Sequence, residues 1–264
     1  MPERCRVSLF LSGFPLWAAA ILLVVVPTIA AMCGPVLIRR RISLERLTSN
    51  NEIAGFKFAT VGVIYAVLLA FAVIVAWEKF SEAEIAVVQE AGAAATLYRL
   101  AAGPEPEAAA TRAALDNYIR LAISRDWPSM AKAKASHEVT QALDALYANT
   151  VHLTEKKSRP PEIFGEMFKQ LDAITQARRT RLHLSTGIVP ELLWTVLYCG
   201  AILTVGFTFF FGTKNLPAQV MMTGILSVLV FMGLLLIISF DYPFTGPVHV
   251  GNEPLQHVVE PSLR

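Results

Sequence analysis

The chain has 264 residues, of which 54% are hydrophobic and only 17% are charged. A soluble globular domain carries about 25% charged residues, so this composition predicts an integral membrane protein that is partly solvated by lipid. A net charge of +2 provides no basic field for nucleic acid. Three cysteines, all inside or beside apolar stretches, exclude a disulfide framework and a thiolate zinc site.

Apolar stretches without Asp, Glu, Lys or Arg are the main signal along the chain. A spanning helix needs about 20 apolar residues, and four stretches are long enough: Val7–Ile38, Phe58–Trp77, Leu192–Thr213 and Asn215–Phe240. The first exceeds the roughly 7–15 apolar residues of a signal peptide. We therefore expect an uncleaved helix near Leu16–Leu37, kinked or ended by Pro27 and Pro35.

The second apolar stretch carries a seam of small residues at intervals of four, three, four and four. Its members are Gly55, Ala59, Gly62, Ala66 and Ala70. Small residues at this spacing let helices approach closely, which favours tight packing against a neighbouring helix. A sharper interpretation is that this face surrounds a pore whose hydrophobic constriction gates by dewetting.

The charged residues are concentrated in residues 78–190, which contain equal numbers of each sign, 14 Lys/Arg and 14 Asp/Glu. Their periodicity is helical, and it predicts helices over 78–102, 106–124 and 136–153 and from Glu162 onward. Asp126-Trp127-Pro128 is expected to break the second of these helices. Four amphipathic helices can bury their apolar stripes as a bundle.

These elements predict an all-α membrane protein with four transmembrane helices and a soluble helical bundle between the second and third. The expected divisions are a first hairpin over 1–77, the helical domain over 78–190, a second hairpin over 191–240 and a C-terminal tail over 241–264.

An arginine cluster near the end of the fourth domain helix is the most suggestive charged feature. Arg178 falls on the apolar stripe of that helix, and Arg181 lies beside it. An unpaired buried charge is costly, so we expect Arg178 to pair with Glu90 on the long helix that leaves the second crossing. The alternative is that the cluster lies beside the membrane and helps to orient the third crossing.

No catalytic pattern is present. The five histidines lack the spacing of a metal site, and there is no nucleophile elbow, P-loop or glycine-rich dinucleotide turn. The membrane stretches have no internal charges, which argues against a voltage sensor or a proton relay. We expect neither enzymatic activity nor a cofactor or metal.

Three segments of the sequence resemble the bacterial bestrophin-like membrane proteins. One runs from Phe71 to Ala91, and another combines Ala177–Leu182 with Pro190–Trp194, Gly200 and Phe211-Gly212. The most specific segment is the tail after the last crossing. It is marked by Asp241, Pro243, Phe244 and Gly246.

The resemblance implies a homo-oligomeric, for example pentameric, ion channel whose second helix lines the pore. Its partners would be the lipid bilayer, further copies of the chain and inorganic ions. It also implies a bacterial inner-membrane location with the helical domain and both termini in the cytoplasm. The positive-inside rule does not decide the orientation, because six Lys/Arg lie near the helix ends on each side. Thr245–His249 lacks the acidic run of a bestrophin calcium site, so no such site is expected.

A second class of function stays open. The sequence has no charged ring and no carbonyl-filter motif in its membrane stretches. The alternative is therefore a non-conducting sensor or scaffold that uses the helical domain to bind a partner.

Overall fold

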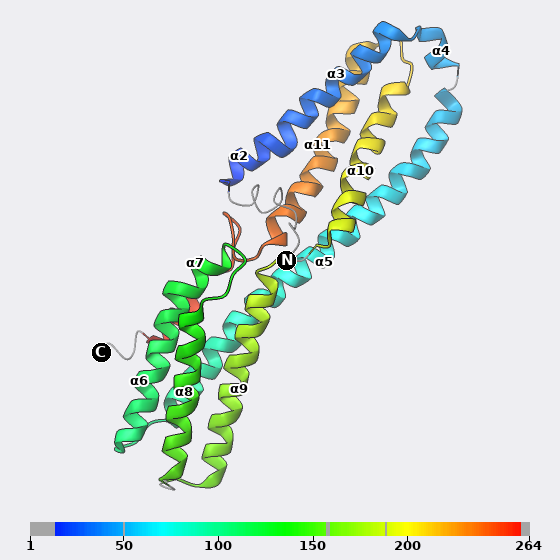
Figure 1. Cartoon of the computed structure of the whole chain (residues 1–264). Coiled ribbons are helices and arrows are strands. Elements are labelled where there is room, and N and C mark those ends of the chain that lie inside the picture. The colour runs from blue at the N-terminus through cyan, green and yellow to red at the C-terminus, as the bar shows by residue number, and fades with distance from the viewer. Residues whose placement is uncertain (1–13, 50, 157–158, 188, 260–264) are drawn as a thin grey trace. The chain divides into compact units, whose positions relative to one another are not determined.

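The computed structural model describes residues 14–49, 51–156, 159–187 and 189–259. Within these ranges the chain is helical and contains no strand (Figure 1), so the predicted all-α class is confirmed. Residues 7–13 of the first apolar stretch, together with Cys5, lie outside the described residues. The chain forms two compact units. The membrane unit comprises Met1–Glu78 and Val189–Asp241, and the helical unit comprises Lys79–Ile188 and Tyr242–Arg264.

Four helices in the described ranges are long and apolar enough to cross a membrane, as the sequence predicts. The first spans Leu16–Arg41 and consists of α2 (Leu16–Ala20), the π-turn η1 (Ile21–Val25) and α3 (Val26–Arg41). After the short α4 (Leu44–Thr48) comes α5 (Asn51–Leu100), which continues from the membrane unit into the helical unit. The last two are α10 (Glu191–Phe207), extended by η3 (Thr208–Phe210), and α11 (Leu216–Asp241).

The first membrane helix continues past both of its prolines. Pro35 lies inside α3, and Pro27 stands two residues after the π-turn η1. Proline removes one backbone hydrogen bond and its ring clashes with the preceding turn. A π-turn widens the helix at that point. The π-turn η1 can accommodate Pro27 in this way, and the helix also continues past Pro35 to Arg41.

A second π-turn shows that the predicted break at Asp126-Trp127-Pro128 is wrong. There α6 (Pro106–Leu121) passes through the π-turn η2 (Ala122–Asp126) directly into α7 (Trp127–Met130). Pro128 stands two residues after the π-turn, as Pro27 does after η1. The helical path ends only after Met130, where Ala133 adopts a left-handed φ of 55°.

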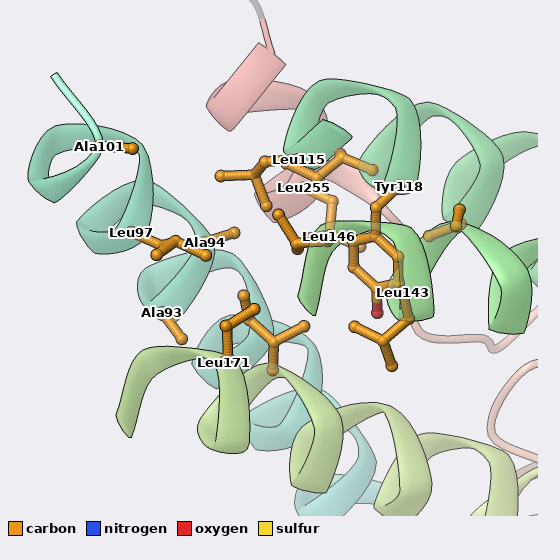
Figure 2. Close-up of a cluster of buried hydrophobic side chains, with 14 of the residues drawn as sticks. Ala93, Ala94, Leu97, Ala101, Leu115, Tyr118, Leu143, Leu146, Leu171 and Leu255 are labelled. Carbon is orange, nitrogen blue, oxygen red and sulfur yellow. The ribbon is translucent and has the colours of Figure 1, made fainter. Parts of the chain in front are cut away.

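The helical unit packs α6 and the second half of α5 against α8 (His137–Glu155) and α9 (Pro161–Leu184). Figure 2 shows Leu97, Leu115, Leu146 and Leu171 converging from these four helices, and each is fully buried. The C-terminal α12 (Glu253–Val259) completes this core through Leu255, which is also fully buried. Burial of each such leucine stabilises the unit by about 1.5–3 kcal/mol.

The membrane unit has a separate core, to which α5 contributes one narrow stripe. Tyr65, Ala72 and Ala76 are buried there with apolar residues of α3, α10 and α11. The hydroxyl of Tyr65 donates to the Leu197 carbonyl oxygen at 3.0 Å. Position 200 must be glycine for this contact, because a Cβ there would lie 2.5 Å from the Tyr65 ring.

Candidate functional site

Four charged side chains are buried together inside the helical unit. Glu90 on α5, Asp126 in η2 and Arg181 on α9 are 0% exposed, and Arg178 on α9 is 6% exposed. Arg178 and Arg181 are three residues apart, so both project from the same face of the helix. We call these four side chains the charge network.

The charge network consists of two bidentate ion pairs with a bridge between them. Arg181 donates through Nε to Glu90 Oε2 at 2.8 Å and through Nη2 to Oε1 at 3.1 Å. Arg178 donates through Nε to Asp126 Oδ2 at 2.8 Å and through Nη2 to Oδ1 at 3.3 Å. Arg181 Nη2 also lies 3.5 Å from Asp126 Oδ2. This fork-to-carboxylate geometry gives strong, charge-assisted hydrogen bonds.

Neighbouring groups satisfy the remaining polar atoms of the two acids. The Tyr118 hydroxyl donates to Glu90 Oε1 at 2.6 Å, and the Ser136 amide donates to Asp126 Oδ1 at 3.1 Å. The result is a neutral cluster of two cations and two anions without an open side. Such complete pairing is what makes buried charge tolerable.

The two arginines find further partners of their own. Arg178 also donates to Thr140 Oγ1 and to the Ser136 carbonyl oxygen, both at 3.3 Å. The Arg181 guanidinium lies 4.4 Å from the centroid of the Trp127 ring, in a cation–π contact.

Protonation states follow from this environment. Burial raises the pKa of Tyr118 well above its ordinary value of 10.0, and the charge of Glu90 raises it further. Burial alone lowers the pKa of Arg181, but its attraction to Glu90 and its hydrogen bond with that carboxylate outweigh this effect and raise it. Tyr118 therefore stays a neutral donor and Arg181 stays a cation, so the charge network suits a structural lock.

The structure corrects the expected pairing of Arg178 with Glu90. Arg178 binds Asp126, and Glu90 binds Arg181. Sequence reasoning missed Asp126 because a residue beside Trp-Pro suggests a loop, whereas the π-turn keeps it on a helix and directs it inward. Arg178 is enclosed in the bundle and is therefore no snorkelling anchor, while Arg179 is exposed.

The tail residues of the sequence signature lie in two places. Asp241, at the end of α11, accepts the Val189 amide at 2.7 Å and Trp194 Nε1 at 3.3 Å within the membrane unit. Pro243, Phe244 and Gly246 belong to the helical unit. There Gly246 adopts a φ of 81°, which other residues rarely adopt.

Trp127 joins the tail to the charge network. Phe244 packs edge-on against the Trp127 ring at 6.0 Å, and Trp127 Nε1 donates to the Val250 carbonyl oxygen at 3.2 Å. The Val250 amide donates to the Pro243 carbonyl oxygen at 2.7 Å, which closes the tail loop. One indole therefore contacts both Arg181 and the tail.

The small-residue seam of α5 lies outside the core of its own chain. Ala59, Ala66 and Ala70 are exposed, and a Cβ added at Gly62 would meet no atom within 4 Å. Gly55 would just reach Phe211 at 4.0 Å. Only 11% of the apolar window of α5 is buried, against 28–39% in the other three membrane helices. One face of α5 is therefore free of partners in the described part of the chain.

No group of three His, Cys, Asp or Glu side chains that could hold a metal occurs among the described residues. The charge network itself offers a metal no vacant oxygen, because both carboxylates are engaged by the two arginines.

Comparison with known proteins identifies the fold and the family. The family model of the bestrophin-like domain matches residues 25–255. Solved structures of a bacterial bestrophin homologue from Klebsiella pneumoniae share the fold. One variant superposes with a TM-score of 0.71 at 14% identity, covering 91% of this chain and 99% of that one. A second variant gives 0.72 at 17% identity, covering 92% and 99%.

A third structure of the same homologue, solved by zinc phasing, gives a TM-score of 0.71 at 15% identity and covers 89% of this chain and 97% of that one. No protein of curated function matches the chain. The family match extends over most of the sequence and agrees with the four apolar helices. The chain is thus an integral membrane protein that belongs to the bestrophin-like family.

Proposed function

We propose that the protein is a homo-oligomeric ion-conducting pore in which the membrane part of α5 lines the pathway. The observation that carries this proposal is the unpartnered face of α5. A membrane helix with one packed stripe and one free face is suited to a ring of copies. In such a ring the packed stripe faces the protomer's own core and the free face points to the axis.

The chemistry of the free face suits a hydrophobic constriction. Residues 58–77 contain no charge, so an ion would meet small, aliphatic and aromatic side chains there. Such a constriction gates by wetting and dewetting. Small side chains such as Gly62 and Ala66 leave room for a water-filled state, whereas larger ones would favour the dry state.

The helical unit supports this role by holding the far half of α5. Glu90 lies on the same continuous helix as the seam and is bound by Arg181. Within the helical unit, the charge network therefore fixes which side of this half of α5 faces the bundle.

Ion flux measured with purified protein in liposomes tests the proposal. We expect flux above that of protein-free liposomes, and we expect Gly62→Leu to reduce it. Gly206→Leu on α10 is the matched control, since a Cβ there also meets no atom within 4 Å. Absence of flux, or equal loss in both variants, would contradict a pore lined by this face.

A groove in the helical unit favours the second candidate function, a sensor that binds a partner. The groove has a volume of about 570 Å³ and lies between α5 and α12. Its lining combines apolar residues with a few polar ones. It includes Val88, Gly92, Tyr98, Arg99, His257 and Val258. If liposomes carrying the wild type show no flux, this groove is the first place to seek a ligand.

A further inference from the structure

One end of the membrane unit carries a concentration of positive charge. We call its cations the basic collar: Arg39, Arg40, Arg41, Arg46, Lys57 and Lys214. Only Glu45 and Glu52 oppose them within residues 39–57 and at the turn before α11.

Contacts between the two hairpins gather the basic collar at this end. Arg39 Nη2 donates to the Thr213 carbonyl oxygen. The Asn51 side chain pairs with the backbone of Gly212 in both directions, and the Gly212 amide reaches Asn51 Oδ1 at 2.9 Å. Figure 1 shows the end of α3, α4, the start of α5 and the turn before α11 together at one end of this unit.

Ion pairs among the described residues do not neutralise this positive charge. Arg40, Arg41, Arg46, Lys57 and Lys214 are exposed, and none of them forms an ion pair with a described residue. Exposed cations of this kind are free to bind an anion from outside.

The basic collar lies at the depth of lipid headgroups. The helix Leu16–Arg41 has 26 residues, a length of about 39 Å, whereas the hydrocarbon core is about 30 Å thick. Its terminal arginines therefore extend past the acyl chains. Ile53 and Phe56, near the start of α5, are 61% and 79% exposed. Phe56 adjoins Lys57, so an apolar surface that can contact a lipid acyl chain lies next to a cation that can bind the lipid phosphate.

We propose that the basic collar binds the phosphate groups of anionic phospholipids in the leaflet that it faces. Guanidinium groups match the geometry of phosphate oxygens, and each Lys or Arg near an anionic surface adds to the attraction. The lipid is the expected source of phosphate because apolar side chains adjoin the cations. This binding is independent of ion conduction.

Lipid selectivity of the reconstituted full-length protein tests the proposal. The measurement is the association of spin-labelled phosphatidylglycerol, relative to spin-labelled phosphatidylcholine, in phosphatidylcholine vesicles. The test variant combines Arg40→Gln, Arg41→Gln and Arg46→Gln. The control combines Arg120→Gln, Lys132→Gln and Lys134→Gln, which removes three exposed charges from the helical unit.

We expect the wild type and the control variant to prefer phosphatidylglycerol by about fivefold, and the test variant, which keeps Arg39, Lys57 and Lys214, to show a clearly smaller preference. Added salt should lower the preference of the wild type, which checks the proposal even if the test variant does not fold. Three results would overturn it: no preference in the wild type, equal loss in the control, or displacement of the labelled lipid by millimolar inorganic phosphate.

Discussion

Arg178 and Asp126 are held together by two hydrogen bonds inside the helical unit, although 52 residues separate them along the chain. Periodicity placed Arg178 on the apolar stripe and so predicted that it needs a partner. It could not select the partner, because the inward direction of Asp126 depends on a π-turn that residue preferences do not reveal. Periodicity also placed Arg181 only beside the apolar stripe, and its full burial was therefore not predicted.

Replacement of Arg178 by alanine should destabilise the protein by about 3–5 kcal/mol, because it leaves the Asp126 carboxylate buried without its main partner. Arg179→Ala is the control, since Arg179 is exposed on the same helix, and it should change stability little. Unfolding in detergent measures both. A double-mutant cycle should show coupling of Arg178 to Asp126 of about 0.5–3 kcal/mol. Stronger coupling to Glu90 would refute the pairing.

Tyr118 makes a prediction about pH. Its pKa is raised well above 10.0 in the folded protein, so the folded state retains a proton that the unfolded state loses in alkaline solution. Its contribution to stability is therefore complete below pH 10 and declines as pH rises above that value. Tyr118→Phe should flatten the decline of stability between neutral and strongly alkaline pH. An unchanged slope would mean that Tyr118 does not contribute.

At the scale of elements, the membrane helices were predictable because long apolar runs without charge have few other structures available. The third domain helix, expected over 136–153, is observed as His137–Glu155. The break at residues 126–128 was wrong, since a local rule for proline takes no account of a π-turn that absorbs it. The packing of α12 into the bundle could not be predicted from the sequence either, because a seven-residue helix has too few turns to show periodicity.

Substitution of Trp127 tests whether its indole Nε1 donor holds the tail in place. Trp127→Phe keeps a ring beside Arg181 but removes the Nε1 donor to Val250. We expect a loss of stability of only about 1 kcal/mol, together with faster hydrogen exchange over residues 243–259. Trp17→Phe is the control, because Trp17 is 69% exposed in another unit. Unchanged exchange in the tail would show that the indole donor does not hold it.

At the scale of the whole molecule, the chain passes from the membrane unit to the helical unit, back to the membrane unit and again to the helical unit. The first hairpin and the second hairpin form one core, although the helical unit separates them in sequence. The tail then returns to the helical unit, where Leu255 and Val259 are buried. Each membrane helix was recognisable alone, but the free face of α5 emerges only when all four helices are packed.

Orientation in the membrane is the property that charge counting leaves undecided. We propose that the helical unit is cytoplasmic, as the family resemblance implies, and that the basic collar faces the opposite side. Four crossings place these two regions on opposite sides, since α5 crosses once between them. Two variants of a chain without its native cysteines, each with one introduced cysteine, should therefore give opposite labelling results. Lys134 and Ser49 suit this purpose because both are exposed.

In intact cells, an impermeant thiol reagent should label the Ser49→Cys variant and leave the Lys134→Cys variant unlabelled. Permeabilised cells serve as the control, and both variants should then react. The converse pattern, with Lys134→Cys labelled and Ser49→Cys protected, would reverse the orientation. It would also place the basic collar in the cytoplasm, as the positive-inside rule favours when that loop is considered alone. The anionic leaflet that the basic collar faces would then be the cytoplasmic one.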